Sequence, residues 1–233
     1  MRQHSGIGVL DKAVSVLYAV VEHPCGLNDL CTRTGLPRAT AHRLAVGLEV
    51  HRLLARDNNG LWRPGPALAE LATGASDPLH EAAAAILPRL REITGESVQI
   101  YCRDGNARVC VAALEPTVGL RDTVPIGSRL PLTAGSAAKV LLTWADSELQ
   151  RTILADAVFG ERALAEVRKR GWAQSAAERA SGVASVSAPV RDAAGTVIAA
   201  VSVSGPIDRM GRRPGARWAA DLVAAAEAIH KRL

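Results

Sequence analysis

The residues that follow Pro37 have the types and the spacing needed to contact DNA. Arginine donates in pairs of hydrogen bonds to phosphate and guanine, and threonine and histidine can reach base edges. On a helix that starts with Pro37, one face is apolar and consists of Ala41, Leu44, Ala45 and Leu48, and polar side chains take the opposite face. The residues on that outer face or at its edge are Arg38, Ala39, Thr40, His42 and Arg43.

Within this set the expected roles differ. We expect Arg38 and Thr40 to position the helix and to read base edges, and His42 and Arg43 to face the major groove. Pro37 suits the first turn, because the N–H groups of a first turn have no intrahelical acceptor and the missing N–H therefore costs little. Two alternatives stay open: an intramolecular salt bridge for Arg43 and an ordinary exposed imidazole for His42.

A second basic element follows this helix. Residues 53–56 and 61–63 have the pattern of two short strands, and the Asn-Gly step at 59–60 is typical of a hairpin turn. Arg56 and Arg63 lie on these strands, where they can reach phosphate or the minor groove. The pattern therefore predicts a wing beside the helix.

Serine hydroxyls repeat on the strands predicted near the C-terminus. Because successive residues of a strand point to opposite faces, Ser185 and Ser187 share a face, and so do Ser202 and Ser204. Hydroxyls on one face of an apolar strand, with Ser175 nearby, suit a pocket for a small polar ligand. The alternative is an ordinary solvent-facing strand.

Two other patterns resemble reactive sites that we do not assign. Ser136-Ala-Ala-Lys139 matches the nucleophile motif of penicillin-recognising enzymes, but no Ser-Asp-Asn or Lys-Thr-Gly follows it. Cys25 and Cys31, with His23 nearby, do not have the spacing of a standard zinc site. We predict no catalytic residue, no metal and no cofactor.

The elements that position the basic helix form a winged helix-turn-helix over residues 1–65. Pro24 and Gly26 end the first helix, Asn28 is the expected N-cap of the second, and Gly35 is its expected left-handed stop. The first helix has an apolar stripe at three- and four-residue spacing, formed by Leu10, Val14, Leu17 and Val21.

The sequence pattern after residue 65 predicts a linker helix at 66–83, which breaks near 74–78. It then predicts an α+β domain at 84–233. Cys102 and Cys110 can face each other across the first hairpin of that domain, where we expect reduced, buried thiols. The predicted helices cover 79–94, 136–144 and 161–170, and the predicted hairpin strands are 98–102 with 108–112 and 183–190 with 197–203.

Composition sets limits on the class of protein. The 233 residues carry a net charge of +5, which is compatible with a polyanionic partner. Four cysteines do not suggest a disulfide framework. The sequence shows neither a signal peptide nor an apolar run of about 20 residues, so we expect a soluble cytoplasmic protein with no membrane partner.

Over nearly its full length the chain resembles the IclR family of bacterial transcriptional regulators. The similarity includes residues 36–44 and a signature of Gly171, Ser175 and Glu178 that continues through 185–192 to a last strand at 201–206. Relatives often carry Asp at the position of Ser175 and an aromatic residue or His at that of Arg191.

This resemblance implies a GAF-like effector domain, a dimer or dimer of dimers, and double-stranded DNA with a pseudo-palindromic operator as partner. It also implies that the start of the helix at 136 holds a carboxylate, because a helix N-terminus favours an anion. The implied effector-binding residues are Ser136, Ala137, Ser175, Ser185, Ser202 and Ser204.

Residues 121–125 and 182–190 are most similar to the LtbR/NdgR-type branch, which is linked to leucine and other amino-acid biosynthesis. We therefore expect a regulator, not an enzyme, whose effector is an amino acid or related carboxylate. Two alternatives come from other classes: an enzyme that carries a DNA-binding-like domain, and a non-specific nucleic-acid or protein-interaction module.

Overall fold

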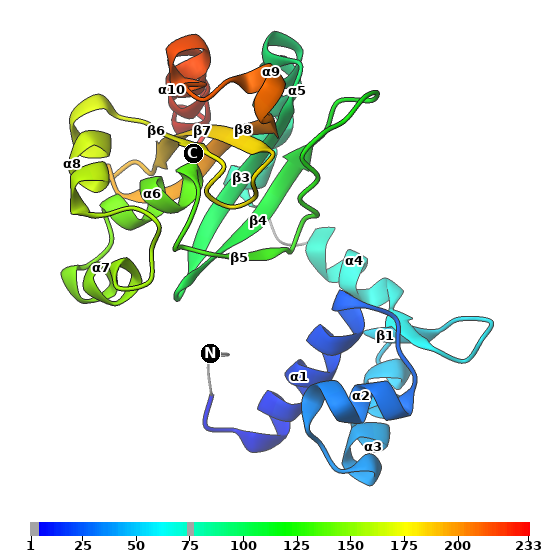
Figure 1. Cartoon of the computed structure of the whole chain (residues 1–233). Helices are drawn as coiled ribbons and strands as arrows, with labels where there is room; N and C mark the ends of the chain where they lie inside the picture. Colours follow the sequence, from blue (N-terminus) through cyan, green and yellow to red (C-terminus); the bar gives the residue numbers. More distant parts are fainter. Residues whose placement is uncertain (1–4, 74–76) are drawn as a thin grey trace. The chain divides into compact units, whose positions relative to one another are not determined.

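The computed structural model describes residues 5–73 and 77–233 (Figure 1). The chain forms two units, Met1–Ser76 and Asp77–Leu233. The helix α4 (Pro66–Thr73) belongs to the first unit and α5 (Pro78–Thr94) to the second. The helix break expected near 74–78 falls mostly outside the described residues, and the domain limits at 65 and 83 stay predictions.

The first unit contains three helices followed by a two-stranded hairpin. Gly35 ends α2 with a φ of 69°, the left-handed conformation that glycine adopts without strain. Pro37 is the N-cap residue of α3, one position before the first turn. The elements of this unit before α4 are α1 (Gly8–Glu22), α2 (Leu27–Thr34), α3 (Arg38–Val50), β1 (Leu54–Arg56) and β2 (Trp62–Pro64).

The apolar stripe predicted on α1 is not the face that enters the core. The residues that enter the core are Val16, Ala19 and Val20, each at most 2% exposed, whereas Leu10 and Val21 are 48% and 49% exposed. Of the predicted stripe, only the residue at 17 packs against the core. Because α1 is apolar on more than one side, spacing alone does not identify the side that is buried.

The predicted N-cap of α2 is also wrong. The cap position is Gly26, and Asn28 lies inside the first turn. The Oδ1 atom of Asn28 accepts a hydrogen bond from Nη1 of Arg38, which joins the beginning of α2 to the beginning of α3. The amide side chain therefore links two helices instead of capping one.

The wing is a hairpin in which Arg56 pairs with Trp62. Asp57 stabilises its turn, because Oδ1 accepts two backbone N–H groups of the turn at 2.9 Å each. Cys25 extends the hairpin through two backbone hydrogen bonds to Trp62, at 3.0 and 3.1 Å. These bonds join the wing to the segment between α1 and α2.

The second unit contains one antiparallel sheet with the strand order β5-β4-β3-β8-β7-β6. The two predicted hairpins are β3–β4 and β7–β8, and β3 pairs with β8 at the centre of the sheet. The strands are β3 (Ser97–Asp104), β4 (Ala107–Leu114), β5 (Arg129–Pro131), β6 (Ala173–Ala176), β7 (Val183–Arg191) and β8 (Val197–Pro206).

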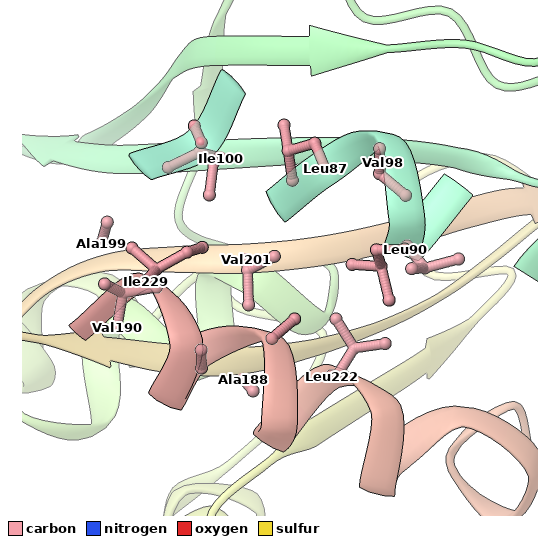
Figure 2. Close-up of a cluster of buried hydrophobic side chains, with 14 of the residues drawn as sticks. Leu87, Leu90, Val98, Ile100, Ala188, Val190, Ala199, Val201, Leu222 and Ile229 are labelled. Carbon is pink, nitrogen blue, oxygen red and sulfur yellow. The ribbon is translucent and has the colours of Figure 1, made fainter. Parts of the chain in front are cut away.

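One face of the sheet is apolar and is covered by α5 and α10 (Gly215–His230) (Figure 1). Figure 2 shows Leu90 of α5 and Leu222 and Ile229 of α10 against Val98 and Val201 of the central strands. Asp77 caps α5 by accepting the N–H of the residue at 79, at 3.0 Å. This packing fixes the central strands, and so it fixes the direction of the side chains on their other face.

The opposite face carries α6 (Ser136–Thr143), α7 (Ser147–Leu154) and α8 (Glu161–Arg170) (Figure 1). All eight residues of α6 are buried. Because strand residues alternate, the serines of β7 and β8 lie on the α6 side and the valines between them face α5 and α10. The sequence prediction missed α7, α10, β5, β6 and the short α9 (Ile207–Met210).

The cysteines of the first hairpin do not face each other. A register shift in β3 places Cys110 opposite Tyr101 and Cys102 opposite Val109, so the two thiols lie on different faces of the sheet. All four cysteines of the chain are free. Within the described part of the chain, no helix is both long and apolar enough to cross a membrane.

Candidate nucleic-acid interface and ligand pocket

The outer face of α3 is open to solvent. Ala41 and Ala45 are fully buried on the inner face. None of the ion pairs among the described residues involves Arg43, so the salt-bridge alternative for that side chain is not found. Of the predicted DNA-binding residues on this helix, Thr40 is half-buried and the exposed ones are Arg38, Ala39, His42 and Arg43.

Glu49, near the end of α3, holds the wing against this helix. Its Oε2 accepts hydrogen bonds from Nε1 of Trp62 and Nε of Arg56, both at 3.2 Å. The Arg56 guanidinium lies over the Trp62 ring, with Cζ 4.4 Å from the ring centroid. The His42 ring meets the same indole edge-on, at a centroid distance of 6.1 Å.

Trp62 therefore connects the exposed face of α3 with the wing. It is only 2% exposed, and its neighbours on the surface are an arginine and a histidine of the predicted interface. Arg56 is held by two intramolecular contacts, whereas Arg63 is exposed on the other strand of the wing. The two wing arginines thus have different freedom to reach a phosphate.

The residues predicted for the effector pocket come together in the second unit. They come from α6, β6, β7 and β8 and line one concave site. Cross-strand pairing explains the convergence, because Ser185 lies between Ser175 on β6 and Ser204 on β8. The predicted residues that line this site are Ser136, Ala137, Ser175, Ser185, Ser202 and Ser204.

Four hydroxyls, those of Ser136, Ser185, Ser187 and Ser202, form a connected hydrogen-bond network. The Oγ atom of Ser136 lies 2.7 Å from Oγ of both Ser185 and Ser187. Ser187 donates in turn to Ser202 at 2.9 Å. Further along β8, Oγ of Ser204 accepts from Nε2 of the buried glutamine at 99, at 3.0 Å. The network fixes the hydroxyl positions beneath α6.

Glu178 of the signature positions the start of α6. Its Oε2 accepts the backbone N–H of Gly135 at 3.1 Å, and its Oε1 pairs with Nζ of Lys139. Gly135 has a φ of 98°, a conformation that favours glycine. Lys139 therefore pairs with Glu178, not with Ser136, which argues against a serine nucleophile here.

Sequence reasoning missed a buried arginine in this site. Arg108 of β4 is 3% exposed, and its Nη1 donates to the carbonyls of Ala134, at 3.0 Å, and Pro131. The alternation of β4 signals this inward position, because Arg108 and Cys110 lie two residues apart and both are buried. Burial lowers the pKa of Arg108 to about 10, so the guanidinium stays charged at neutral pH.

Tyr101 of β3 lies beside that guanidinium, with its ring centroid 5.5 Å from Cζ of Arg108. The ring is 4% exposed. Burial raises the pKa of Tyr101 well above its usual value, so its hydroxyl stays neutral and can donate to a ligand.

An ion pair lies at the edge of the site. Nη2 of Arg179 contacts both carboxylate oxygens of Asp122, at 2.6 and 2.5 Å. Asp122 belongs to the segment between β4 and β5, and Arg209 of α9 holds this segment by donating to the carbonyl of Leu120 at 2.6 Å. The side chain of Asp122 is 8% exposed and that of Arg179 is 28% exposed.

The unfilled space between these side chains is about 20 Å³, which is room for a water-sized group. A larger ligand must displace a side chain, and Arg179 is the more exposed member of the ion pair. Among the described residues, no three histidine, cysteine or acidic side chains lie close enough to hold a metal ion.

Two family models together cover most of the chain. The model described as the IclR helix-turn-helix domain matches residues 9–58, and the model described as the bacterial transcriptional regulator IclR C-terminal matches residues 72–231. These matches correspond to the two units that contain the α3 surface and the serine-lined pocket.

Similar proteins agree with these matches. The HTH-type transcriptional regulator BhcR of Paracoccus denitrificans is 30% identical over 222 residues, covering 88% of this chain and 80% of that protein. The HTH-type transcriptional repressor AllR of Escherichia coli K12 is 29% identical, covering 88% and 82%. The families and these relatives are transcriptional regulators, not enzymes.

A solved structure has the same fold. An IclR homologue from Microbacterium hydrocarbonoxydans, complexed with 4-hydroxybenzoate, superimposes with a TM-score of 0.85 at 25% identity. The superposition covers 97% of this chain and 98% of that chain. The 4-hydroxybenzoate is bound to that homologue.

Proposed function

The chain belongs to the IclR family of bacterial transcriptional regulators, and from this premise we propose that it is a repressor whose operator affinity is set by a small carboxylate. Its relative AllR is named a repressor, which supports that mode of action. The proposed DNA contacts come from α3 and the wing, through Arg38, Ala39, Thr40, His42, Arg43, Arg56 and Arg63.

One observation carries the effector half of the proposal. Serines from three strands and the first turn of α6 line one small site. The first turn of a helix has backbone N–H groups without intrahelical partners, and its dipole favours negative charge. The proposed ligand is an acid whose carboxylate lies at Ser136 and Ala137 and whose remaining polar atoms meet the other serines.

We propose a homodimer or a dimer of dimers on a pseudo-palindromic operator. The support comes from α1, whose Leu10, Val14 and Val21 stand 48%, 38% and 49% exposed. A second copy of the first unit would remove this apolar stripe from water, and two α3 helices would then address two half-sites.

We propose that the linker at 66–83 transmits the effector signal. If the effector changes the spacing of two recognition helices, operator affinity changes by the coupling free energy, typically about 1–3 kcal/mol. The proposed targets are amino-acid biosynthesis genes, including those for leucine, because residues 121–125 and 182–190 resemble the LtbR/NdgR-type branch. A regulator that binds the chromosome would work in the cytoplasm.

The experiment is a binding titration with DNA from upstream of the coding region and from leucine-biosynthesis promoters. Fluorescence anisotropy is recorded at about 150 mM salt with excess competitor DNA, because phosphate contacts make affinity salt-dependent. We expect retained binding to a near-palindromic site and a change in affinity when small acids are added. Binding that competitor DNA removes from every promoter, with and without added acids, would overturn the proposal.

A further inference from the structure

A second concave site lies in the effector domain, and none of the described residues lines both it and the serine-lined pocket. Its volume is about 330 Å³, which is within the range of small-molecule sites. Among the described residues that line it, two alanines are the only apolar ones, so the site suits a charged ligand. The other lining residues are Lys139, Glu166, Arg170, Gln174, Glu178 and Arg212.

The start of α10 is fixed against β6, and this contact shapes the site. The backbone N–H of Gly215 donates to Oε1 of Gln174 at 3.0 Å. A Cβ on Gly215 would lie 2.0 Å from the Trp172 ring, so glycine allows α10 to pack directly on the indole. The segment between α9 and α10, which carries Arg212, is therefore held beside β6 and the end of α8.

Two guanidinium groups of this site have no carboxylate partner. Among the described residues, no ion pair involves Arg170 or Arg212. Nε of Arg170 donates to the carbonyl of Trp172 at 2.8 Å, and its Cζ lies 3.9 Å from the centroid of that ring. The stacking orients the guanidinium plane and leaves its two terminal nitrogens to a ligand.

The acids of the site do not cancel these charges. Glu166 forms its ion pair with Arg162, at 3.5 Å, outside the site. Burial lowers the pKa of Arg170, and the charge of Glu166 only partly opposes this shift. An anion would restore part of the solvation that burial removes. The dipole of α8 explains cations in its last turn, but it does not explain Arg212, which lies on another segment.

Lys139 adds a third cation from α6. Its Nζ donates to the carbonyl of Gln174 at 2.9 Å and pairs with Glu178. A lysine ammonium has three N–H donors, so one is left for a ligand. Three cations and two acids line the site, and its net charge is therefore positive.

We propose that this cavity is a second ligand site, which binds a small dianion through Arg170 and Arg212. Two guanidinium forks from separate segments match two negative charges and several acceptor oxygens, as in a phosphate ester or a dicarboxylate. The buried ammonium of Lys139 contributes the remaining donor. This site goes beyond the proposed function, which concerns DNA and the serine-lined pocket.

The test is isothermal titration calorimetry of the full-length protein with inorganic phosphate, succinate and acetate at matched ionic strength. The pH is mildly alkaline, so that phosphate is mainly a dianion. Each titration is repeated on Ser202→Val, in which the serine-lined pocket is filled, so that the binding that remains lies outside that pocket.

In Ser202→Val we expect at least one dianion to bind about tenfold more tightly than acetate, because acetate can pair with only one guanidinium. Tighter binding of phosphate identifies a phosphate ester as the ligand class, and tighter binding of succinate identifies a dicarboxylate. Three results would overturn the proposal: no saturable binding of either dianion up to about 10 mM, acetate bound as tightly, or binding in the wild type that Ser202→Val abolishes.

A matched pair of variants locates the binding. Arg212→Gln removes an exposed side chain that has no ion pair among the described residues, so the fold should be kept while dianion affinity falls about tenfold. Arg213→Gln removes the same charge from the next residue, which is exposed and does not line the site, and affinity should stay unchanged. Equal losses in the two variants would show that only net charge matters.

Arg170→Gln should weaken binding as Arg212→Gln does, but it also removes the stacking on Trp172. If Arg170→Gln does not fold, the comparison of Arg212→Gln with Arg213→Gln decides the question. The titrations contain no DNA, so their failure leaves the proposed regulator intact, and failure of operator binding leaves this site intact.

Discussion

The Glu49 carboxylate accepts a 3.2 Å hydrogen bond from the indole Nε1 of Trp62, and this bond joins α3 to the wing. The same carboxylate oxygen holds Arg56. A residue near the end of the helix that we propose contacts DNA therefore determines how one of the wing arginines is held. The consequence is that loss of Glu49 should affect folding and DNA binding together.

We expect Glu49→Ala to destabilise the first unit. The substitution leaves the N–H of Trp62 unpaired at a site that is 2% exposed, which costs about 1–3 kcal/mol. Chemical denaturation of the full chain would measure the loss. Asp29→Ala, which removes an exposed 3.9 Å pair with Arg33, is the control and should cost less than about 1 kcal/mol. Equal losses in the two variants would argue against a special role for Glu49.

A salt titration of DNA binding should distinguish the role of Arg63 from that of Arg56. Arg63 is exposed, so Arg63→Ala should weaken binding to all sequences alike and reduce the salt slope by about 1 if Arg63 contacts a phosphate. Arg56 is already paired with Glu49 and stacked on Trp62, so Arg56→Ala should mainly lower the free energy of unfolding. The reverse pattern would show that Arg56 leaves its intramolecular contacts when DNA binds.

Arg43→Ala should reduce operator affinity by about 1–3 kcal/mol and relax sequence preference, because Arg43 is exposed on the outer face of α3. Anisotropy titrations with the operator and a scrambled duplex measure both quantities. Arg162→Ala removes the same charge from a side chain that is 94% exposed in the other unit, and it should have little effect. A uniform loss on both duplexes would make Arg43 a phosphate contact only.

Ser202→Val should abolish the effector response and leave DNA binding intact. Ser202 is 2% exposed in a site with about 20 Å³ of free space. Valine lacks the hydroxyl that donates to the backbone of β7, and its larger side chain fills the pocket. The readout is operator affinity with and without the acid that binds best. Ser181→Val, in an exposed turn, is the control. A normal response in Ser202→Val would place the effector elsewhere.

Local patterns predicted much of this molecule. The period of two along β7 and β8 identified Ser202 and Ser204 as one face, because strand geometry alone sets that direction. The Asn-Gly turn identified the wing, since its backbone conformation depends only on nearby residues. Hydroxyls and turns of this kind need no knowledge of distant contacts.

The features that the sequence did not predict depend on contacts between residues far apart in the chain. The Asp122–Arg179 pair joins positions 57 residues apart, from a loop and the segment after β6, and no local period connects them. Arg108 was detectable, because it occupies an inward position of β4, yet its role depends on the start of α6. The apolar stripe of α1 did not identify its buried side, because only tertiary packing chooses between its apolar faces.

The Lys139–Glu178 pair provides a test of how the start of α6 is held. Lys139 has a side chain 9% exposed, and Glu178 is 20% exposed and also accepts the N–H of Gly135. Lys139→Met should leave a partly buried carboxylate without its cation and cost about 2–4 kcal/mol, less than for a fully buried pair.

The double variant Lys139→Met with Glu178→Gln should lose less stability than the sum of the single variants, because neither uncompensated charge remains. Chemical denaturation of the wild type, the two single variants and the double variant completes the double-mutant cycle. Since the amide introduced by Glu178→Gln can still accept from Gly135 but carries no charge, effector affinity should fall less in Glu178→Gln than in Glu178→Ala. Additive stabilities would mean that the pair is not coupled and that α6 is positioned by its buried apolar residues alone.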